Sequence, residues 1–139
     1  MTVWLGRPLI LAVHDMQIAE HGGGSGVRDL GLLESALARP INLAAYGKPD
    51  NAELGAAYAI AIARNHPFVD GNKRTAWAAM VTFFDLNGVE FDPGEVEATA
   101  TMLLLAAGEI DDTSFIAWVR QHAHTLYPLG YSVDARTAL

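Results

Sequence analysis

The segment 66–74 places four chemically active side chains close together in the order His-Pro-Phe-Val-Asp-Gly-Asn-Lys-Arg. An imidazole can accept a proton at neutral pH, so His66 can act as a general base. Asp70 can hold a magnesium ion against phosphate oxygens, because Mg²⁺ is commonly bound by a carboxylate together with phosphates and water. Lys73 and Arg74 add two positive charges. The segment therefore contains a base, a metal ligand and cations, which are the parts that phosphoryl transfer needs.

The charge around this segment differs from that of the whole chain. The formal net charge is −7, which argues against a broad nucleic-acid or anionic-membrane surface, since such surfaces need an excess of lysine and arginine. Between residues 54 and 84, however, Asp70 is the only carboxylate, whereas Arg64, Lys73 and Arg74 are cations. The pattern predicts a local anion site in an acidic protein. Arg64 has two open interpretations: it reaches the phosphates, or it merely completes its helix.

Two apolar helices are expected to position the segment, one before it and one after it. The stretch 75–84 contains no charged residue, and a helix that is apolar on nearly every side belongs in the interior of a bundle. The 3.6-residue periodicity predicts six helices in all, and so an all-α bundle around a buried central helix. The expected helices span 8–20, 30–38, 52–64, 72–86, 93–107 and 113–125.

The loop between the two apolar helices is expected to be stiff. Pro67 disfavours a helical conformation at His66 and so ends the first helix, and Gly71 permits a tight turn before the second helix begins near Asn72. Backbone N–H groups at a helix N-terminus lack helical partners and, together with the helix dipole, favour an anion. Phosphate is the expected ligand.

Other helix starts are predicted from capping patterns. Asp29 is a plausible cap for the second helix. Asp50 with Glu53, and Asp92 with Glu95, have the spacing of an N-cap followed by a third-position carboxylate that reaches back to the cap.

Glycine and proline mark the expected breaks between helices. The glycine-rich stretch 22–26 is interpreted as a flexible loop, and it is a weak candidate for a phosphate cradle because no Lys-Ser/Thr follows and no strand precedes it. Further breaks are expected at 40–49 and 87–88. The alternation at 89–91 is at most a short strand.

The bulk composition is that of one globular domain. A chain of 139 residues with 51% hydrophobic content can bury one core, and we expect a single domain over 1–126 followed by a loosely held tail over 127–139. The absence of cysteine excludes a disulfide framework and any thiolate metal site. With no signal peptide or membrane-spanning run in the sequence, the cytoplasm is the expected location.

The remaining histidines are weaker candidates for chemistry. His14 and His21 lie on a similar helix face, but a metal site is disfavoured because no third ligand is suitably spaced. His122 and His124 are interpreted as surface residues or as cations facing the C-terminal dipole of the last helix.

The segment 66–74 resembles the signature of the Fic/Doc superfamily. Its Lys73, where most Fic enzymes have glycine, is similar to the Doc (death-on-curing) toxin branch. The stretches 14–15, 22–29, 31–36 and 107–110 are also similar to Doc-like chains in order and spacing, so the resemblance covers about residues 14–123.

The resemblance implies a role for each matching residue. The histidine at the position of His66 is the catalytic base, the acidic residue at Asp70 positions the metal, and the phenylalanine at Phe68 anchors the loop in the core. Arg74 is expected to steady the charge of the transition state. The phosphate- and nucleotide-binding positions are Gly71, Asn72, Lys73 and Arg74.

The Doc branch implies a toxin that uses ATP or another nucleoside triphosphate, with Mg²⁺, to phosphorylate a serine or threonine of a target protein. By resemblance that target is translation factor EF-Tu, whose modification halts protein synthesis. Lys73 occupies space that glycine leaves open, which gives a physical reason for a reversed nucleotide pose and transfer of the terminal phosphate. Two alternatives stay open: transfer of AMP by the same base and metal, and a catalytically silent binding module.

The resemblance also implies a partner. Self-restrained Fic proteins carry a Ser/Thr-x-x-x-Glu-Gly/Asn inhibitory helix, and the sequence contains no such pattern. Inhibition is therefore expected from a Phd-like antitoxin whose helical C-terminal segment packs into a groove of the domain.

Overall fold

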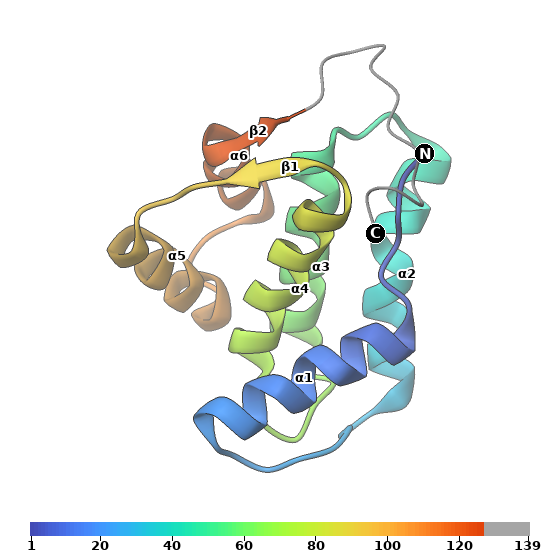
Figure 1. The fold of residues 1–139 in the computed structure, drawn as a ribbon, viewed down its shortest axis with the longest axis vertical. Coiled ribbons are helices and arrows are strands. Elements are labelled where there is room, and N and C mark those ends of the chain that lie inside the picture. Colours follow the sequence, from blue (N-terminus) through green and yellow to red (C-terminus); the bar gives the residue numbers. More distant parts are fainter. Residues whose placement is uncertain (127–139) are drawn as a thin grey trace.

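Two antiparallel helices joined by the segment 66–71 form the centre of the molecule. They are α3 (Asn51–Asn65) and α4 (Asn72–Leu86), which pack side by side in the computed structural model (Figure 1). Every residue of 54–63 in α3 is buried, so α3 is the more completely enclosed of the two. A Cβ on Gly55 would lie 2.3 Å from Cε1 of Phe84, and the lack of a side chain at Gly55 is therefore what lets α4 approach α3 so closely.

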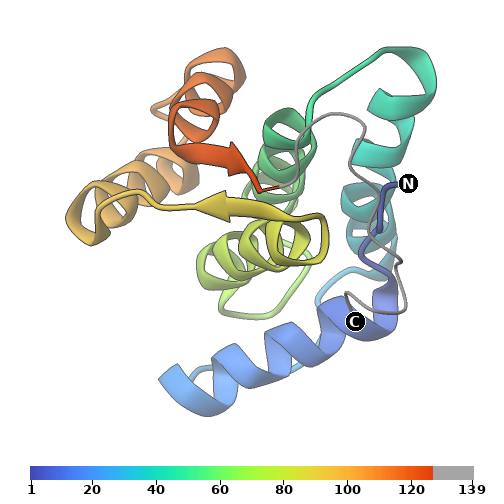
Figure 2. The ribbon, with the colours of Figure 1, turned by 45° about the horizontal axis from the view of Figure 1, so that its top comes forward.

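The other elements surround this pair. Helix α1 (Arg7–His21) crosses the end at which α3 turns into α4, and α2 (Leu30–Tyr46) lies along α3 (Figure 1). On the opposite side lie α5 (Glu95–Ala107) and α6 (Asp112–His122), as Figure 2 also shows. The strands β1 (Val89–Phe91) and β2 (Ala123–Thr125) form an antiparallel pair with Val89 opposite Thr125. Within residues 1–126, six helices and one two-stranded sheet confirm the predicted mostly helical bundle.

One aromatic-rich cluster forms the core of the described residues, 1–126. Phe83 packs against Tyr58 and Phe84, with ring centroids 5.3 and 6.1 Å apart. The hydroxyl of Tyr58 accepts a hydrogen bond from the backbone N–H of Leu5 at 3.0 Å, which fastens the N-terminal segment to the core. Burial raises the pKa of the Tyr58 phenol, so this hydroxyl is neutral at physiological pH. The expected tail, 127–139, lies outside the described residues.

The prediction for the second helix was too short. Helix α2 continues through Pro40 to Tyr46, although a proline inside a helix loses one backbone hydrogen bond and costs about 3 kcal/mol. The buried residues explain why the helix persists, because Leu33, Ala36, Leu37 and Pro40 follow the spacing of one apolar helix face. That face packs on α3. The expected break at 40–49 is thus confined to the residues after Tyr46.

Two of the three predicted caps are confirmed. Asp29 accepts a hydrogen bond from Leu32 N at 3.0 Å, and Asp50 accepts one from Glu53 N at 2.9 Å. The cap predicted at Asp92 is wrong: α5 begins at Glu95 after Gly94, without a side-chain cap.

Strand pairing explains the missing cap. Asp92 N donates to the carbonyl of His122 at 3.1 Å, and an Asp92 carboxylate oxygen lies 3.2 Å from Nε2 of His124. Asp92 therefore belongs to the end of the small sheet. The last helix was also predicted too long, because residues 123–125 pair with β1 as a strand. None of the described helices combines the length and apolarity needed to cross a membrane.

Candidate active site

His66 stands at the C-terminal end of α3 in a left-handed conformation, with φ 49° and ψ 54°. It is the only non-glycine residue with positive φ among the described residues. Such a conformation is costly for a residue with a Cβ and persists where the surroundings hold it. Here the guanidinium of Arg28 donates to the carbonyls of His66, at 2.7 Å, and Asn65, at 2.9 Å. The backbone that carries the imidazole is therefore held from outside the segment 66–74.

The end of the glycine-rich stretch and the two residues after it pair with the segment 66–70. Val27 forms an isolated antiparallel bridge with Phe68, Val69 N donates to Gly26 O at 3.1 Å, and Arg28 N donates to Pro67 O at 2.7 Å. The side chain of Phe68 is 1% exposed and lies in the core cluster. A buried ring on one side and backbone pairing on the other fix the middle of the segment.

Asp70 is the exposed carboxylate at the turn into α4. One carboxylate oxygen accepts a hydrogen bond from Gly71 N at 2.7 Å, and the other lies 3.4 Å from Gly24 N. Gly71 has φ 76°, a conformation that glycine adopts without strain.

The side-chain amide of Asn72 closes the turn. It accepts a hydrogen bond from Phe68 N at 2.9 Å and donates one to Phe68 O at 3.0 Å. Both ends of the amide are thus bonded within the segment, and the backbone N–H of Asn72 lies at the start of α4, where N–H groups have no acceptor within the helix. The phosphate-binding role of Asn72 stays a prediction.

Lys73 and Arg74 lie in the first turn of α4, and both are exposed. Helix α4 has no side-chain cap and no acidic residue in its first turn. Within residues 1–126, no ion pair involves either cation. Two unneutralised positive charges therefore coincide with free backbone donors at a helix N-terminus, which is the arrangement that attracts an anion.

A hollow of about 400 Å³, here called the catalytic hollow, brings the predicted residues together. Its walls are formed by His66 and by the residues from Val69 to Arg74. A second hollow of about 600 Å³, the α5 groove, shares Lys73 and Arg74 and continues between α1, α4 and α5. Its further lining includes His21, Trp77, Phe91 and Met102. The cation pair thus stands between a small polar site and a larger, partly aromatic groove.

The donors of the catalytic hollow fit a magnesium ion carried by phosphates. Asp70 is its only carboxylate, and the described residues contain no cluster of three or more His, Cys, Asp or Glu side chains suited to a metal. Such a site would bind a bare ion weakly, but Mg²⁺ prefers one or two carboxylates with substrate phosphates and water. The neighbouring cations and the helix N-terminus are the groups that would bind the phosphates.

Arg64 is turned away from this site. Its guanidinium pairs with the carboxylate of Asp112 and approaches the carbonyl of Ile110 at 3.5 Å. Arg39 pairs with the other oxygen of Asp112 at 3.1 Å. Of the two interpretations of Arg64, the structure supports the structural one.

The other histidines divide between core and surface. His21 lines the α5 groove, whereas His14 is buried beneath the segment 66–74, so the two side chains have different surroundings. His122 lies in the last turn of α6, with Nε2 3.5 Å from a carboxylate oxygen of Glu97, and His124 is exposed on β2.

The sequence analysis assigned no role to His14 or Arg28, the two side chains that hold the segment from outside. Both belong to stretches similar to Doc-like chains. For His14 a further signal was available, because Ile10, His14 and Ile18 recur at helical spacing and so place the histidine on the inward face of α1. No comparable signal pointed to Arg28, because its contact is made by a loop.

Comparison with known proteins gives concordant matches. A sequence model described as the Fic/DOC family matches residues 4–84. A protein named Toxin Doc from Mycolicibacterium smegmatis is 45% identical over 93 residues, which are 65% of this chain and 68% of that protein. A protein named Protein kinase doc from Escherichia phage P1 is 37% identical over 115 residues, which are 81% of this chain and 89% of that protein.

Proposed function

The chain belongs to the Fic/Doc family, and on this premise we propose that it is the toxin of a toxin–antitoxin pair and phosphorylates a protein. In this proposal it transfers the terminal phosphate of ATP, or of another nucleoside triphosphate, to a serine or threonine hydroxyl. One observation carries the proposal: His66, Asp70, Lys73 and Arg74 line a single hollow at the uncapped start of α4. In this proposal the base, the carboxylate and the cations act on one phosphate group bound in that hollow.

The proposed reaction follows from these groups. His66 accepts the proton of the target hydroxyl as its oxygen attacks the terminal phosphorus. A new bond forms between that oxygen and phosphorus, the bond to the bridging oxygen breaks, and the nucleoside diphosphate leaves with the bond electrons. Arg74 and the backbone N–H groups of α4 stabilise the charge on the transferred group. Asp70 would hold Mg²⁺, which supplies neutralisation of phosphate charge when it is bound.

The α5 groove is the proposed binding site for the nucleoside or for a helix of an inhibitory partner. Trp77 and Phe91, whose ring centroids are 5.5 Å apart, give one end of it an aromatic wall next to the cation pair. We propose that a Phd-like antitoxin inhibits the protein by placing a helical segment in this groove. Growth arrest that is relieved by co-expression of the adjacent reading frame, and absent in His66→Ala, is the expected result in cells.

Labelled ATP tests the reaction against its nearest alternative, transfer of AMP. If the terminal phosphate is transferred, label at that position reaches protein and label at the innermost phosphate does not. AMP transfer gives the reverse result. Purified EF-Tu is the proposed acceptor, and its role in translation would place the activity in the cytoplasm. A silent binding module would transfer neither label, and its His66→Ala variant would arrest growth as strongly as the parent.

A further inference from the structure

His14 is a buried polar residue that the proposed mechanism does not use. Its side chain is 1% exposed, and its ring is stacked on that of Phe68 with centroids 3.9 Å apart and planes 6° from parallel. Nε2 lies 2.8 Å from the carbonyl oxygen of Asp70. A carbonyl can only accept, so Nε2 carries the proton and donates it. Nδ1 is 3.9 Å from the carboxylate of Asp15, which is too far for a hydrogen bond.

The contact fixes one particular peptide plane. The carbonyl of Asp70 and the N–H of Gly71 belong to the same planar, trans peptide group, so they point in opposite directions. The carbonyl is bonded to His14, and the N–H donates to a carboxylate oxygen of the Asp70 side chain at 2.7 Å. Orienting the peptide from α1 therefore also orients the donor that holds the Asp70 carboxylate.

The neighbouring atoms leave this peptide little freedom. A Cβ on Gly71 would lie 3.1 Å from Cδ1 of Ile18 and 3.7 Å from Nε2 of His14. Gly71 therefore rests directly on α1, and a rotated peptide would leave the Asp70 carbonyl and the His14 ring without partners. An unpaired buried polar group is unfavourable, so the observed orientation is strongly preferred.

We propose that His14 is a positioning residue that orients the carboxylate of Asp70 for the metal–nucleotide complex through the peptide between Asp70 and Gly71. The proposal rests on the proposed function, because it assigns Asp70 to the metal. Outer groups that orient a metal ligand commonly change metal affinity by about 10–100-fold when they are removed.

Three substitutions separate positioning from packing. His14→Phe keeps an aromatic ring against Phe68 but cannot donate to Asp70. His14→Gln places an amide N–H near the position of Nε2 and can restore the hydrogen bond, whereas the shorter His14→Asn cannot reach. Arg28→Met is the matched control, because it removes side-chain bonds to the carbonyls of His66 and Asn65 and leaves the Asp70 peptide untouched.

The measurement is calorimetric titration of each variant with a non-hydrolysable ATP analogue, once with Mg²⁺ and once with a chelator. The readout is the gain in affinity that Mg²⁺ produces. We expect the gain in affinity to be about tenfold smaller in His14→Phe and His14→Asn than in the parent. His14→Gln and Arg28→Met should keep most of the gain. Affinity without Mg²⁺ should change little in any variant. Circular dichroism and thermal unfolding establish that each variant is folded.

The outcomes distinguish the inference from its premise. A parent that binds the analogue without any gain from Mg²⁺ contradicts the metal role of Asp70 and so the proposed function itself. If Mg²⁺ raises the affinity of the parent and raises that of folded His14→Phe equally, the inference alone is overturned. Should His14→Phe fail to fold, the pair His14→Gln and His14→Asn decides, and equal loss of the gain in both would also overturn it.

Discussion

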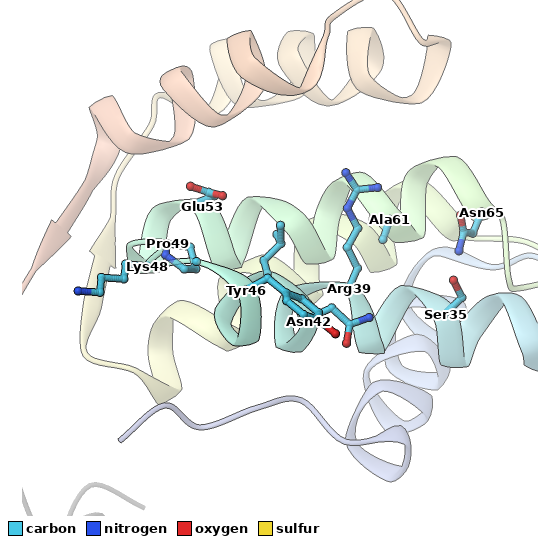
Figure 3. Close-up of a pocket in the computed structure, with 11 residues that line it drawn as sticks. Ser35, Arg39, Asn42, Tyr46, Lys48, Pro49, Glu53, Ala61 and Asn65 are labelled. Carbon is cyan, nitrogen blue, oxygen red and sulfur yellow. The ribbon is translucent and has the colours of Figure 1, made fainter.

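Two basic clusters of the molecule differ in how their charge is balanced. Lys73 and Arg74 line the catalytic hollow, and within residues 1–126 neither forms an ion pair. Arg39 and Arg64 instead share the carboxylate of Asp112. Arg39 also lines a hollow of about 720 Å³ between α2 and α3, here called the α2–α3 hollow (Figure 3).

The difference shows that cavity volume alone does not locate the site. The α2–α3 hollow is larger than the catalytic hollow, yet Arg39 in its wall already has an anionic partner, and its other cation, Lys48, shares the wall with the carboxylate of Glu53. The catalytic hollow combines free cations with an uncapped helix N-terminus and a histidine. A bound phosphate gains the most electrostatic stabilisation from cations that have no other partner, because no existing ion pair has to be broken.

The strongest test of this comparison exchanges one arginine from each cluster for alanine. Arg74→Ala should lower the rate of phosphate transfer by about 10²–10³-fold, the usual effect of removing one donor to transition-state charge. Arg64→Ala should leave the rate within about twofold and lower the free energy of unfolding by at most about 1 kcal/mol, since its ion pair is partly exposed. Transfer of terminal label and urea denaturation measure the two quantities. Equal loss of rate in both variants would remove the distinction between the clusters.

A second test concerns the stiffness of the segment that carries the free cations. Asn72→Ala leaves the N–H and carbonyl of Phe68 without their side-chain partner, and we expect a loss of about 1–3 kcal/mol of stability. Transfer should also fall, because the start of α4 is then less fixed relative to His66. Asn72→Asp is the matched control: a carboxylate can still accept from Phe68 N but cannot donate to Phe68 O. If the stability of Asn72→Asp lies between that of the parent and that of Asn72→Ala, both hydrogen bonds of the Asn72 side chain contribute.

The grouping of the site residues in one hollow was predictable because these residues are close in sequence. His66, Asp70, Lys73 and Arg74 are separated by a few residues, and Pro67 with Gly71 restricts the path between them. Helix periodicity likewise located α3 and α4, which position the segment. The roles assigned to these residues remain predictions until the variants are measured.

The missed features depend on contacts between distant parts of the chain. His14 contacts Asp70 across 56 residues, and Arg64 meets Asp112 only because α6 packs on α3. Similarly, a proline such as Pro40 predicts the end of a helix. In the structure its burial on the apolar face of α2, with Leu33, Ala36 and Leu37, keeps the helix continuous. Local propensity gives no information about such tertiary partners.

A third test converts the balanced cluster into an unbalanced one. Asp112→Asn removes the charge shared by Arg39 and Arg64 and leaves two unneutralised cations near the α2–α3 hollow. We expect this variant to acquire weak phosphate binding there, detected by NMR shift changes near Arg39 that the parent lacks. High salt should weaken the effect, since partly exposed charges are screened. Absence of any such shifts would mean that free cations do not suffice without a helix N-terminus.

The smallest effect is expected at another ion pair, between Arg120 and Asp50, in which both side chains are about half exposed. The hydrogen bond from Arg120 holds the pKa of the Asp50 carboxyl below its ordinary value. A lowered folded-state pKa stabilises the protein above the unfolded pKa of about 3.9, and the contribution disappears as pH falls through the folded value. Arg120→Gln should therefore lower stability by about 0.5 kcal/mol at pH 7, with solvent screening keeping the effect small. The difference from the parent in urea denaturation should vanish in stronger acid, while transfer stays unchanged because Arg120 lines neither the catalytic hollow nor the α5 groove. A difference that grew in acid would contradict the direction of the pKa shift.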